Sequence, residues 1–221
     1  MMKWLLLFIA AGFVFSSCSN LPKVRPAGDL ASKERRSCPN PFPAGKWQFV
    51  HSIEAAMPGG RSVFVTGVVV VSSAERSFRC VIMTLEGLAV FEAEWDRQLT
   101  VNRAIAPFDS KPFAQGMVED IRLLFLQPPG SPLEWGFLEN GNRICRYGES
   151  DGGIVDVASK GNGNWEIRRY ARDFRLLRTV NMASGKKTDH DGTPPRIELT
   201  AHGSEGYKLI MNLIEAVPLD K

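Results

Sequence analysis

Side chains that could carry acid–base or metal chemistry are few in this 221-residue sequence, and the strongest candidate is His190. It lies between Asp189 and Asp191, and a histidine flanked by carboxylates suits proton transfer or metal binding. The surrounding letters KKTDHDG are rich in charge, however, which is typical of a solvated loop. Glu92 and Glu94 alternate with apolar residues, so we expect them on the polar face of a strand rather than in an acid–base pair.

Common catalytic motifs are missing from the sequence. It contains no Gly-x-Ser-x-Gly elbow, no phosphate-binding loop and no His-Glu-x-x-His zinc motif. His51 lies beside aromatic residues on a predicted strand face and His202 precedes a turn, so both fit structural roles. We therefore expect a protein that is not an enzyme and holds no metal and no cofactor. A hydrolase that uses His190 is the enzymatic alternative.

One thiol lies in a setting that favours covalent modification. The apolar run Trp4–Phe15 follows Lys3 and is too short for a bilayer crossing of about 20 residues, but it fits the core of a signal peptide. The letters FSSC end this run, and two small residues before a cysteine are typical of a bacterial lipoprotein cleavage box, in which the thiol receives diacylglycerol. We expect a signal peptide over residues 1–17 and a lipidated Cys18. The alternative is an ordinary signal peptide with an incidental cysteine.

Composition narrows the compartment and the class of partner. Ser19 rather than aspartate follows the cysteine, which favours a lipid anchor in the outer membrane, facing the periplasm. The formal net charge of +3 is too small to indicate a nucleic-acid partner. Of the remaining cysteines, Cys38, Cys80 and Cys145, an oxidising compartment favours one disulfide and one buried thiol, and the spacing leaves the pairing open.

The chain divides into a linker and a folded body. Residues 18–45 are rich in proline, glycine and charge and predict a lipidated N-terminus followed by a flexible tether. Its basic residues suit a solvated linker, and the alternative is contact with anionic headgroups. These residues are Lys23, Arg25, Lys33, Arg35 and Arg36. Residues 46–221 are long enough for one domain with a substantial core.

Strand patterns dominate this body. Residues 46–56 alternate apolar and polar side chains, residues 61–73 are almost continuously apolar, and residues 76–96 predict two strands around Glu86-Gly87. Asn140-Gly141 and Gly161-Asn162-Gly163 predict later hairpin turns. A meander of this kind must cover its edges, so we expect a mainly β (α+β) fold whose antiparallel sheet curls into a barrel or half-barrel.

One helix interrupts the strands. Phe113, Met117, Ile121 and Leu124 recur at helical spacing, and Val118, Phe125 and Leu126 widen the apolar stripe. We expect Asp109 to be the N-cap, Pro112 to lie in the first turn, and Pro128, Pro129 and Gly130 to stop the helix. Such a helix must lie against the sheet, where it plugs the mouth of the curve or simply completes the core.

Three stretches of the body carry a family resemblance. VIMTLEGLAVFEAEW resembles an early hairpin with a protruding apolar tip, GNWEIRRYA a later strand, and PPRIELTAHGSEGYKLIMNLIEA a closing hairpin of the LolA/LolB family. That family comprises an outer-membrane lipoprotein receptor and its periplasmic carrier. The resemblance extends from about Lys46 to Val217, and it includes an uncharacterised lipoprotein branch of the same fold.

The resemblance implies an unclosed β-barrel with a helical lid and a hydrophobic cavity that shelters acyl chains. An acyl chain in water costs about 0.8 kcal/mol per CH₂, which an apolar cavity offsets without chemistry. The residues that we expect to line the cavity, chosen by strand alternation or helix face, are Phe49, Phe64, Val68, Ile82, Phe91, Met117, Ile121, Leu124, Leu199, Leu209 and Met211. The alternative for these side chains is a closed, dry core.

The hairpin tip TLEGLA offers Leu85 and Leu88 for insertion into a membrane, with Glu86 nearest the position where the receptor family has an exposed leucine. The resulting hypothesis is a monomeric lipoprotein that binds acyl chains of a lipid or lipoprotein, receives them with a periplasmic carrier protein, and helps to insert them into the membrane. The alternative is a non-enzymatic scaffold of the cell envelope with a filled core.

Overall fold

The computed structural model describes residues 21–26, 38, 40–183, 193–204 and 206–220. The predicted signal peptide, Cys18 and His190 lie outside this part of the chain. The described residues form one sheet and one helix, α1 (Lys111–Phe125). In chain order the strands are β1 (Arg25–Pro26), β2 (Lys46–Ala56), β3 (Ser62–Ser72), β4 (Ser77–Met83), β5 (Ala89–Asp96), β6 (Gln98–Ala104), β7 (Glu134–Phe137), β8 (Arg143–Gly148), β9 (Ile154–Ser159), β10 (Trp165–Tyr170), β11 (Leu176–Met182), β12 (Arg196–Ala201) and β13 (Lys208–Pro218).

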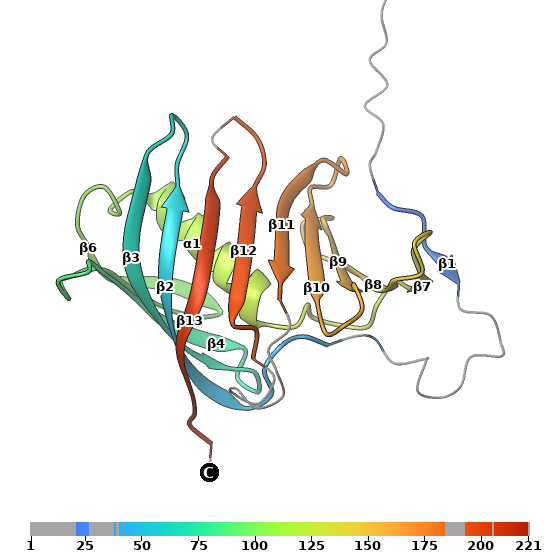
Figure 1. Cartoon of the computed structure of the whole chain (residues 1–221), viewed down its shortest axis with the longest axis horizontal. Coiled ribbons are helices and arrows are strands. Elements are labelled where there is room, and N and C mark those ends of the chain that lie inside the picture. The colour runs from blue at the N-terminus through green and yellow to red at the C-terminus, as the bar shows by residue number, and fades with distance from the viewer. Residues whose placement is uncertain (1–20, 27–37, 39, 184–192, 205, 221) are drawn as a thin grey trace, which may run out of the picture.

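The sheet is antiparallel throughout and is not closed into a barrel. Its thirteen strands follow the order β1-β7-β8-β9-β10-β11-β12-β13-β2-β3-β4-β5-β6, so β1 and β6 are its two edges. At the centre of the sheet, the last strand, β13, pairs along almost its whole length with β2, the strand that begins the folded body. The sheet curves around α1, which crosses behind β2, β13 and β12 in Figure 1. The expected mainly β architecture with a helix against an unclosed sheet is confirmed.

At two of the predicted turns, the backbone has a positive φ that glycine adopts without strain. Gly141 has a φ of 81° and Gly87 has a φ of 88°, a region in which a side chain is strained. At the first turn, the Leu138 N–H donates to the Asn142 carbonyl at 2.9 Å, which closes the β7–β8 hairpin. Asparagine and glycine together therefore set the register of this hairpin, as the sequence predicts.

The start of the helix differs from the prediction by one residue. The N-cap is Ser110, not Asp109: the Ser110 side chain accepts a hydrogen bond from the Phe113 N–H at 3.3 Å. Both residue types can cap, and Ser110 is the one whose side chain faces the free N–H groups of the first turn. The helix ends at Phe125, before Pro128, as expected.

Part of the predicted tether contacts the body. β1 pairs with β7, and a side chain at Gly136 of β7 would collide with the backbone of Arg25. Val24 packs against a small apolar cluster formed by Leu138, Ile144 and Ala158. The Arg146 guanidinium, itself held by Asp156, donates to the Pro22 carbonyl at 2.9 Å. The described residues of the N-terminal segment therefore extend the sheet at its β7 edge.

A disulfide joins the same segment to the core. Cys38 pairs with Cys145 of β8, and their Cα atoms are 5.7 Å apart. Cys80 is the free, buried cysteine, and burial raises the pKa of its thiol to about 12. One disulfide and one buried thiol are thus confirmed, and the structure identifies the pair that spacing leaves open.

Candidate functional site

The inner, concave face of the sheet is the candidate site. Its apolar side chains come from alternate positions of neighbouring strands, as the register shows: Phe49 pairs with Val69, and Ile82 pairs with Phe91. Because side chains alternate between the two faces of a strand, these pairs place one continuous apolar surface on the inner side. This surface and the inner stripe of α1 belong to one hydrophobic cluster.

Helix α1 lies along this surface. Near its N-terminal end, Phe113 packs edge to face against Phe91, with ring centroids 5.4 Å apart. At its C-terminal end, Phe125 stacks on Phe49 at 5.2 Å. The helix therefore spans the concave face from β5 to β2, and Figure 1 shows it on the inner side of the curve. In this arrangement the side chains of α1 cover the apolar surface and fill the core.

Most of the residues predicted to line a cavity meet in this cluster. Phe91 and Leu199 are fully buried, and Met117 and Leu209 are partly buried against the cluster. The nine predicted residues that the structure brings together are Phe49, Ile82, Phe91, Met117, Ile121, Leu124, Leu199, Leu209 and Met211. The structure places these nine side chains in one apolar cluster, and their role as the lining of a ligand cavity stays a prediction.

Phe64 and Val68 lie on the opposite face, so their assignment to the inner surface is wrong. Phe64 pairs with Glu54 and is 56% exposed, and Val68 pairs with Val50. The inward side chains of β3 are those of odd-numbered positions such as Val69. The error has a physical cause: β3 is apolar on both faces, so its alternation offers no polar side to set against an apolar one.

A buried polar network fastens α1 to the sheet. The Arg178 Nε of β11 donates to Asp120 Oδ1 of α1 at 2.9 Å, and the Tyr207 hydroxyl donates to Asp120 Oδ2. Arg178 also lies over the Tyr207 ring, 5.4 Å from its centroid. Burial raises the pKa of Tyr207, and so does the Asp120 charge, so the phenol keeps its proton and remains a donor. We call Asp120, Arg178 and Tyr207 the helix latch.

The helix latch is absent from the sequence predictions, although one signal points to it. Asp120 lies three residues after Met117 and four before Leu124, so the helical spacing places a carboxylate on the apolar stripe. A carboxylate in that position needs a buried partner. The adjacent Glu119 faces outward and pairs with Arg169 of β10 at 3.0 Å.

Comparison with solved structures places this geometry in a known fold. The chain is similar to a crystal structure of a LolA superfamily protein from Nitrosomonas europaea, with a TM-score of 0.51 and 13% sequence identity over 81% of this chain and 89% of that chain. The fold is LolA/LolB-like. No protein-family model and no curated protein matches the chain.

The early hairpin of this LolA/LolB-like fold ends in an apolar tip. Leu85 is 69% exposed and Leu88 is 55% exposed, while the turn itself is closed by the Thr84 N–H, which donates to the Leu88 carbonyl at 2.9 Å. Between them, a hydrogen bond from the Thr84 side chain lowers the pKa of Glu86, so the tip also carries a negative charge. The hairpin is ordered by its backbone and displays both leucines to solvent.

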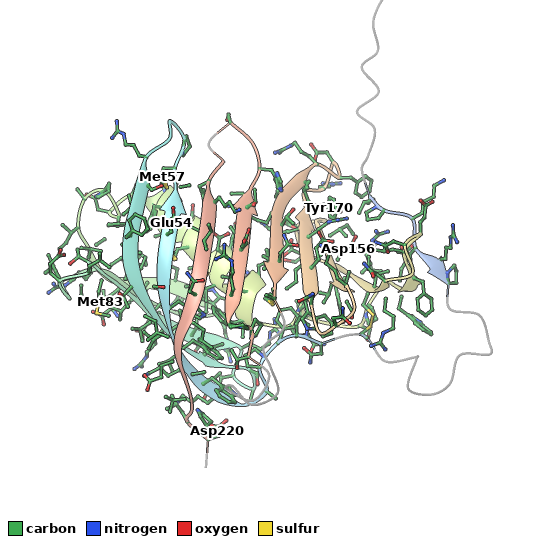
Figure 2. All side chains as sticks on the ribbon, viewed as in Figure 1. Glu54, Met57, Met83, Asp156, Tyr170 and Asp220 are labelled. Atoms are coloured by element: carbon green, nitrogen blue, oxygen red, sulfur yellow. A yellow bond between two sulfur atoms is a disulfide. The ribbon has the colours of Figure 1, made fainter. Side chains whose placement is uncertain are left out.

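The hairpin tip and the N-terminal segment lie at opposite ends of the sheet. Figure 2 shows Met83, at the end of β4, far from Asp156 of β9, the residue that holds Arg146 and through it Pro22. A membrane that contacts both ends of the LolA/LolB-like sheet must therefore run along its length.

Two cavities with mixed polar and apolar linings lie beside the C-terminal end of α1. One of about 400 Å³ is lined by Asn40, Arg76 and Gln127 among others, and one of about 240 Å³ by Arg76, Glu119 and Arg169 among others. Among the described residues, no histidine, cysteine and carboxylate side chains gather in a group that could hold a metal ion. Within the same part of the chain, no helix has the length and apolar character that a bilayer crossing requires.

Proposed function

We propose that this protein is a non-enzymatic lipoprotein, anchored through Cys18 in the outer membrane and facing the periplasm, that binds acyl chains beneath α1. It then helps to transfer the bound lipid or lipoprotein into the membrane, together with a periplasmic carrier protein. The observation that carries the proposal is the covered concave face: a single helix separates a continuous apolar surface from its surroundings. The LolA/LolB-like fold and the leucine tip support it.

Access to the surface requires movement of α1, which covers it. The helix is joined to the sheet by the helix latch, by the Glu119–Arg169 ion pair, by Arg122 over the Trp95 ring and by apolar contacts. An acyl chain can replace the apolar contacts at little cost because both are hydrocarbon. Each buried CH₂ of the ligand contributes about 0.8 kcal/mol. A bound chain can therefore compensate for the contacts that α1 gives up, and affinity stays moderate enough for release.

Replacing Ile82 with aspartate tests binding on the concave face. Ile82 is buried on that face, so the charge is expected to abolish copurification of acyl species with residues 19–221, which retain every described contact. Native mass spectrometry with lipid extraction, after export to the periplasm, measures the bound fraction. The matched control is Val81→Asp, because Val81 is the neighbouring residue on the opposite face.

Circular dichroism tests whether both variants are folded. Should Ile82→Asp not fold, Met117→Lys replaces it, because Met117 is only partly buried and a lysine there can extend to solvent while α1 covers the sheet. A folded wild-type protein that carries no acyl species, and takes none up from added lipoprotein, would contradict the proposal.

Replacing both tip leucines with aspartate tests membrane insertion. Burying one leucine side chain is worth about 1.5–3 kcal/mol, so Leu85→Asp/Leu88→Asp is expected to lower partitioning into zwitterionic vesicles by about 100-fold or more. Since both side chains are exposed, stability should change by less than about 0.5 kcal/mol. Cosedimentation with vesicles gives the partition coefficient.

The control for the tip is Leu133→Asp, a leucine that is 64% exposed but lies in the segment before β7. It removes similar apolar surface at a different place and should leave vesicle binding unchanged. Equal losses for the tip and Leu133 variants would mean that the tip has no special role in insertion.

A scaffold of the cell envelope is the second candidate function. The filled core favours it, because α1 completes the interior without any ligand. A scaffold needs no movement of α1, so acyl species should be absent from the purified protein whether or not the helix latch is intact.

A further inference from the structure

His51 of β2 is a polar side chain on the apolar concave face. It is 1% exposed and packs between aromatic rings, with its centroid 6.3 Å from that of Phe49 and 6.0 Å from that of Phe125 in α1. Within the described part of the chain, neither ring nitrogen has a hydrogen-bond partner. The histidine therefore lies directly under the C-terminal end of the helix with both polar atoms unsatisfied.

An unsatisfied histidine in a core opposes folding. A buried donor or acceptor without a partner carries the full cost of lost hydration, and natural cores satisfy the great majority of such groups. Burial also lowers the pKa of His51 to about 4, so the ring is neutral near pH 7 and offers one N–H donor and one acceptor. A phenylalanine would fill similar space without this cost, so core packing alone does not explain a histidine here.

The two strands that flank His51 leave it without a regular pair of neighbouring side chains. Its partner on β3 is Gly67, which has no side chain, and its partner on β13 is Leu213, which precedes a bulge before Glu215. Bulges are frequent beside functional sites, where they redirect side chains. The inner surface next to His51 is therefore bounded by a glycine and a bulge rather than by two regular rows of side chains.

We propose that His51 donates a hydrogen bond to the ester or amide carbonyl of a bound acyl chain when α1 moves away, and so selects acylated ligands over plain hydrocarbon. This inference rests on the proposed function and names the ligand chemistry of the same surface. The ligand carbonyl then supplies the acceptor that the ring N–H lacks in the covered state, one of the two unsatisfied polar atoms of His51.

A carbonyl fits this position better than a charged headgroup. The side chains nearest to His51 are aromatic, and an ion placed among them without a counter-charge would lose its hydration. A neutral carbonyl needs one donor only, which the neutral imidazole provides. In the helix latch, Asp120 already bonds Arg178 and Tyr207, so these groups satisfy one another.

A competition between two lysophosphatidylcholines tests the inference. They have the same chain length, but one carries an ester and the other an ether that lacks the carbonyl, and both are kept below their micelle concentrations. Native mass spectrometry of residues 19–221 in an equimolar mixture is expected to show about tenfold preference of the wild type for the ester. His51→Phe should bind both lipids equally, and His51→Gln, which keeps a donor, should retain part of the preference.

Stability supplies an independent readout. Because the substitution removes an unsatisfied polar group, His51→Phe is expected to raise the denaturant midpoint, with an unfolding equilibrium constant about tenfold lower. The control is His202→Ala, since His202 lies outside the concave face and its Nε2 bonds the Thr179 hydroxyl at 2.9 Å. It should leave the ester preference unchanged.

The outcomes separate the inference from the proposed function. A wild type that binds neither lipid, and takes up no acyl chain from added lipoprotein, overturns both. A wild type that binds ester and ether equally overturns the role of His51 and leaves the proposed function standing. A His51→Phe variant with an undiminished ester preference likewise overturns the role of His51 but not the proposed function. A synthetic diacylated lipopeptide, compared with the ester lipid, then distinguishes a lipoprotein cargo from a free lipid, because both carry the carbonyl.

Discussion

Replacing Asp120 with alanine is expected to lower the free energy of unfolding by about 3–5 kcal/mol, the cost of removing one partner from a buried ion pair. The side chains of Asp120 and Arg178 are 6% and 16% exposed, so little water can replace the lost carboxylate. Burial alone would lower the pKa of Arg178, and Asp120 raises it. Without Asp120 the guanidinium stays charged beneath α1 and has no counter-charge, although it keeps its hydrogen bonds to the Leu177 carbonyl and the Tyr207 hydroxyl. Urea denaturation followed by circular dichroism measures the loss.

Removing the whole helix latch should have a different effect. Burial raises the pKa of Asp120 above its unfolded value, although Arg178 and Tyr207 act in the opposite direction. Ionisation of Asp120 therefore opposes folding as the pH rises through the folded-state pKa. The variant Asp120→Leu/Arg178→Met/Tyr207→Phe is expected within about 1 kcal/mol of the wild type, or above it.

The neighbouring residue on the same helix gives the matched control. Glu119 is 46% exposed, and Arg169 keeps Glu149 and Asp151 when Glu119 is lost, so Glu119→Ala should cost less than about 1 kcal/mol. A loss for Asp120→Ala no greater than that of the control would show that Arg178 reaches water, and that the latch does not hold α1 in place.

Local patterns explain why so much of the fold can be predicted from the sequence. The alternation in residues 46–56 and the Asn140-Gly141 turn are patterns among residues close in sequence. The structure has a strand at residues 46–56 and a hairpin turn at Asn140-Gly141. The helix likewise follows from the spacing of its apolar residues and from the prolines after it. These signals identify the elements and the apolar side of α1.

Long-range pairing explains what could not be predicted. In β3 both faces are apolar, and only its register with Phe49 of β2 decides that Val69 points inward and Val68 outward. The helix latch joins residues 120, 178 and 207, and no local pattern links them. The pairing of β1 with β7 requires a glycine at position 136, because a side chain there would collide with the backbone of Arg25. Nothing in the local sequence around Gly136 indicates this contact.

Loss of the Cys38–Cys145 disulfide is the second large effect that we expect. The bond spans 107 residues, and a loop of about 100 residues corresponds to about 4.7 kcal/mol of chain entropy in the unfolded state, within a usual range of about 2–5 kcal/mol for native disulfides. The variant Cys38→Ala/Cys145→Ala should therefore be less stable by about that range. Reduction of this disulfide in the wild-type protein should also lower the denaturant midpoint.

The buried thiol provides the internal reporter for this experiment. Burial keeps Cys80 protonated, because it raises the thiol pKa to about 12, so alkylation of Cys80 should require unfolding. The disulfide variant should then be alkylated at Cys80 at lower denaturant than the wild type, at the same midpoint that circular dichroism reports.

The two large effects act on different parts of the molecule, and this separates stability from access to the concave face. The disulfide ties the segment before β2 to β8, whereas the helix latch ties α1 to β11. The triple latch variant replaces the hydrogen bonds between α1 and the sheet with apolar contacts, which an acyl chain can displace, with little loss of global stability. Removing the disulfide should lower global stability while the latch still holds α1. If acyl binding increases in the triple latch variant but not in the disulfide variant, α1 is the element that controls access. Equal binding in both variants would mean that ligands reach the surface by general unfolding instead.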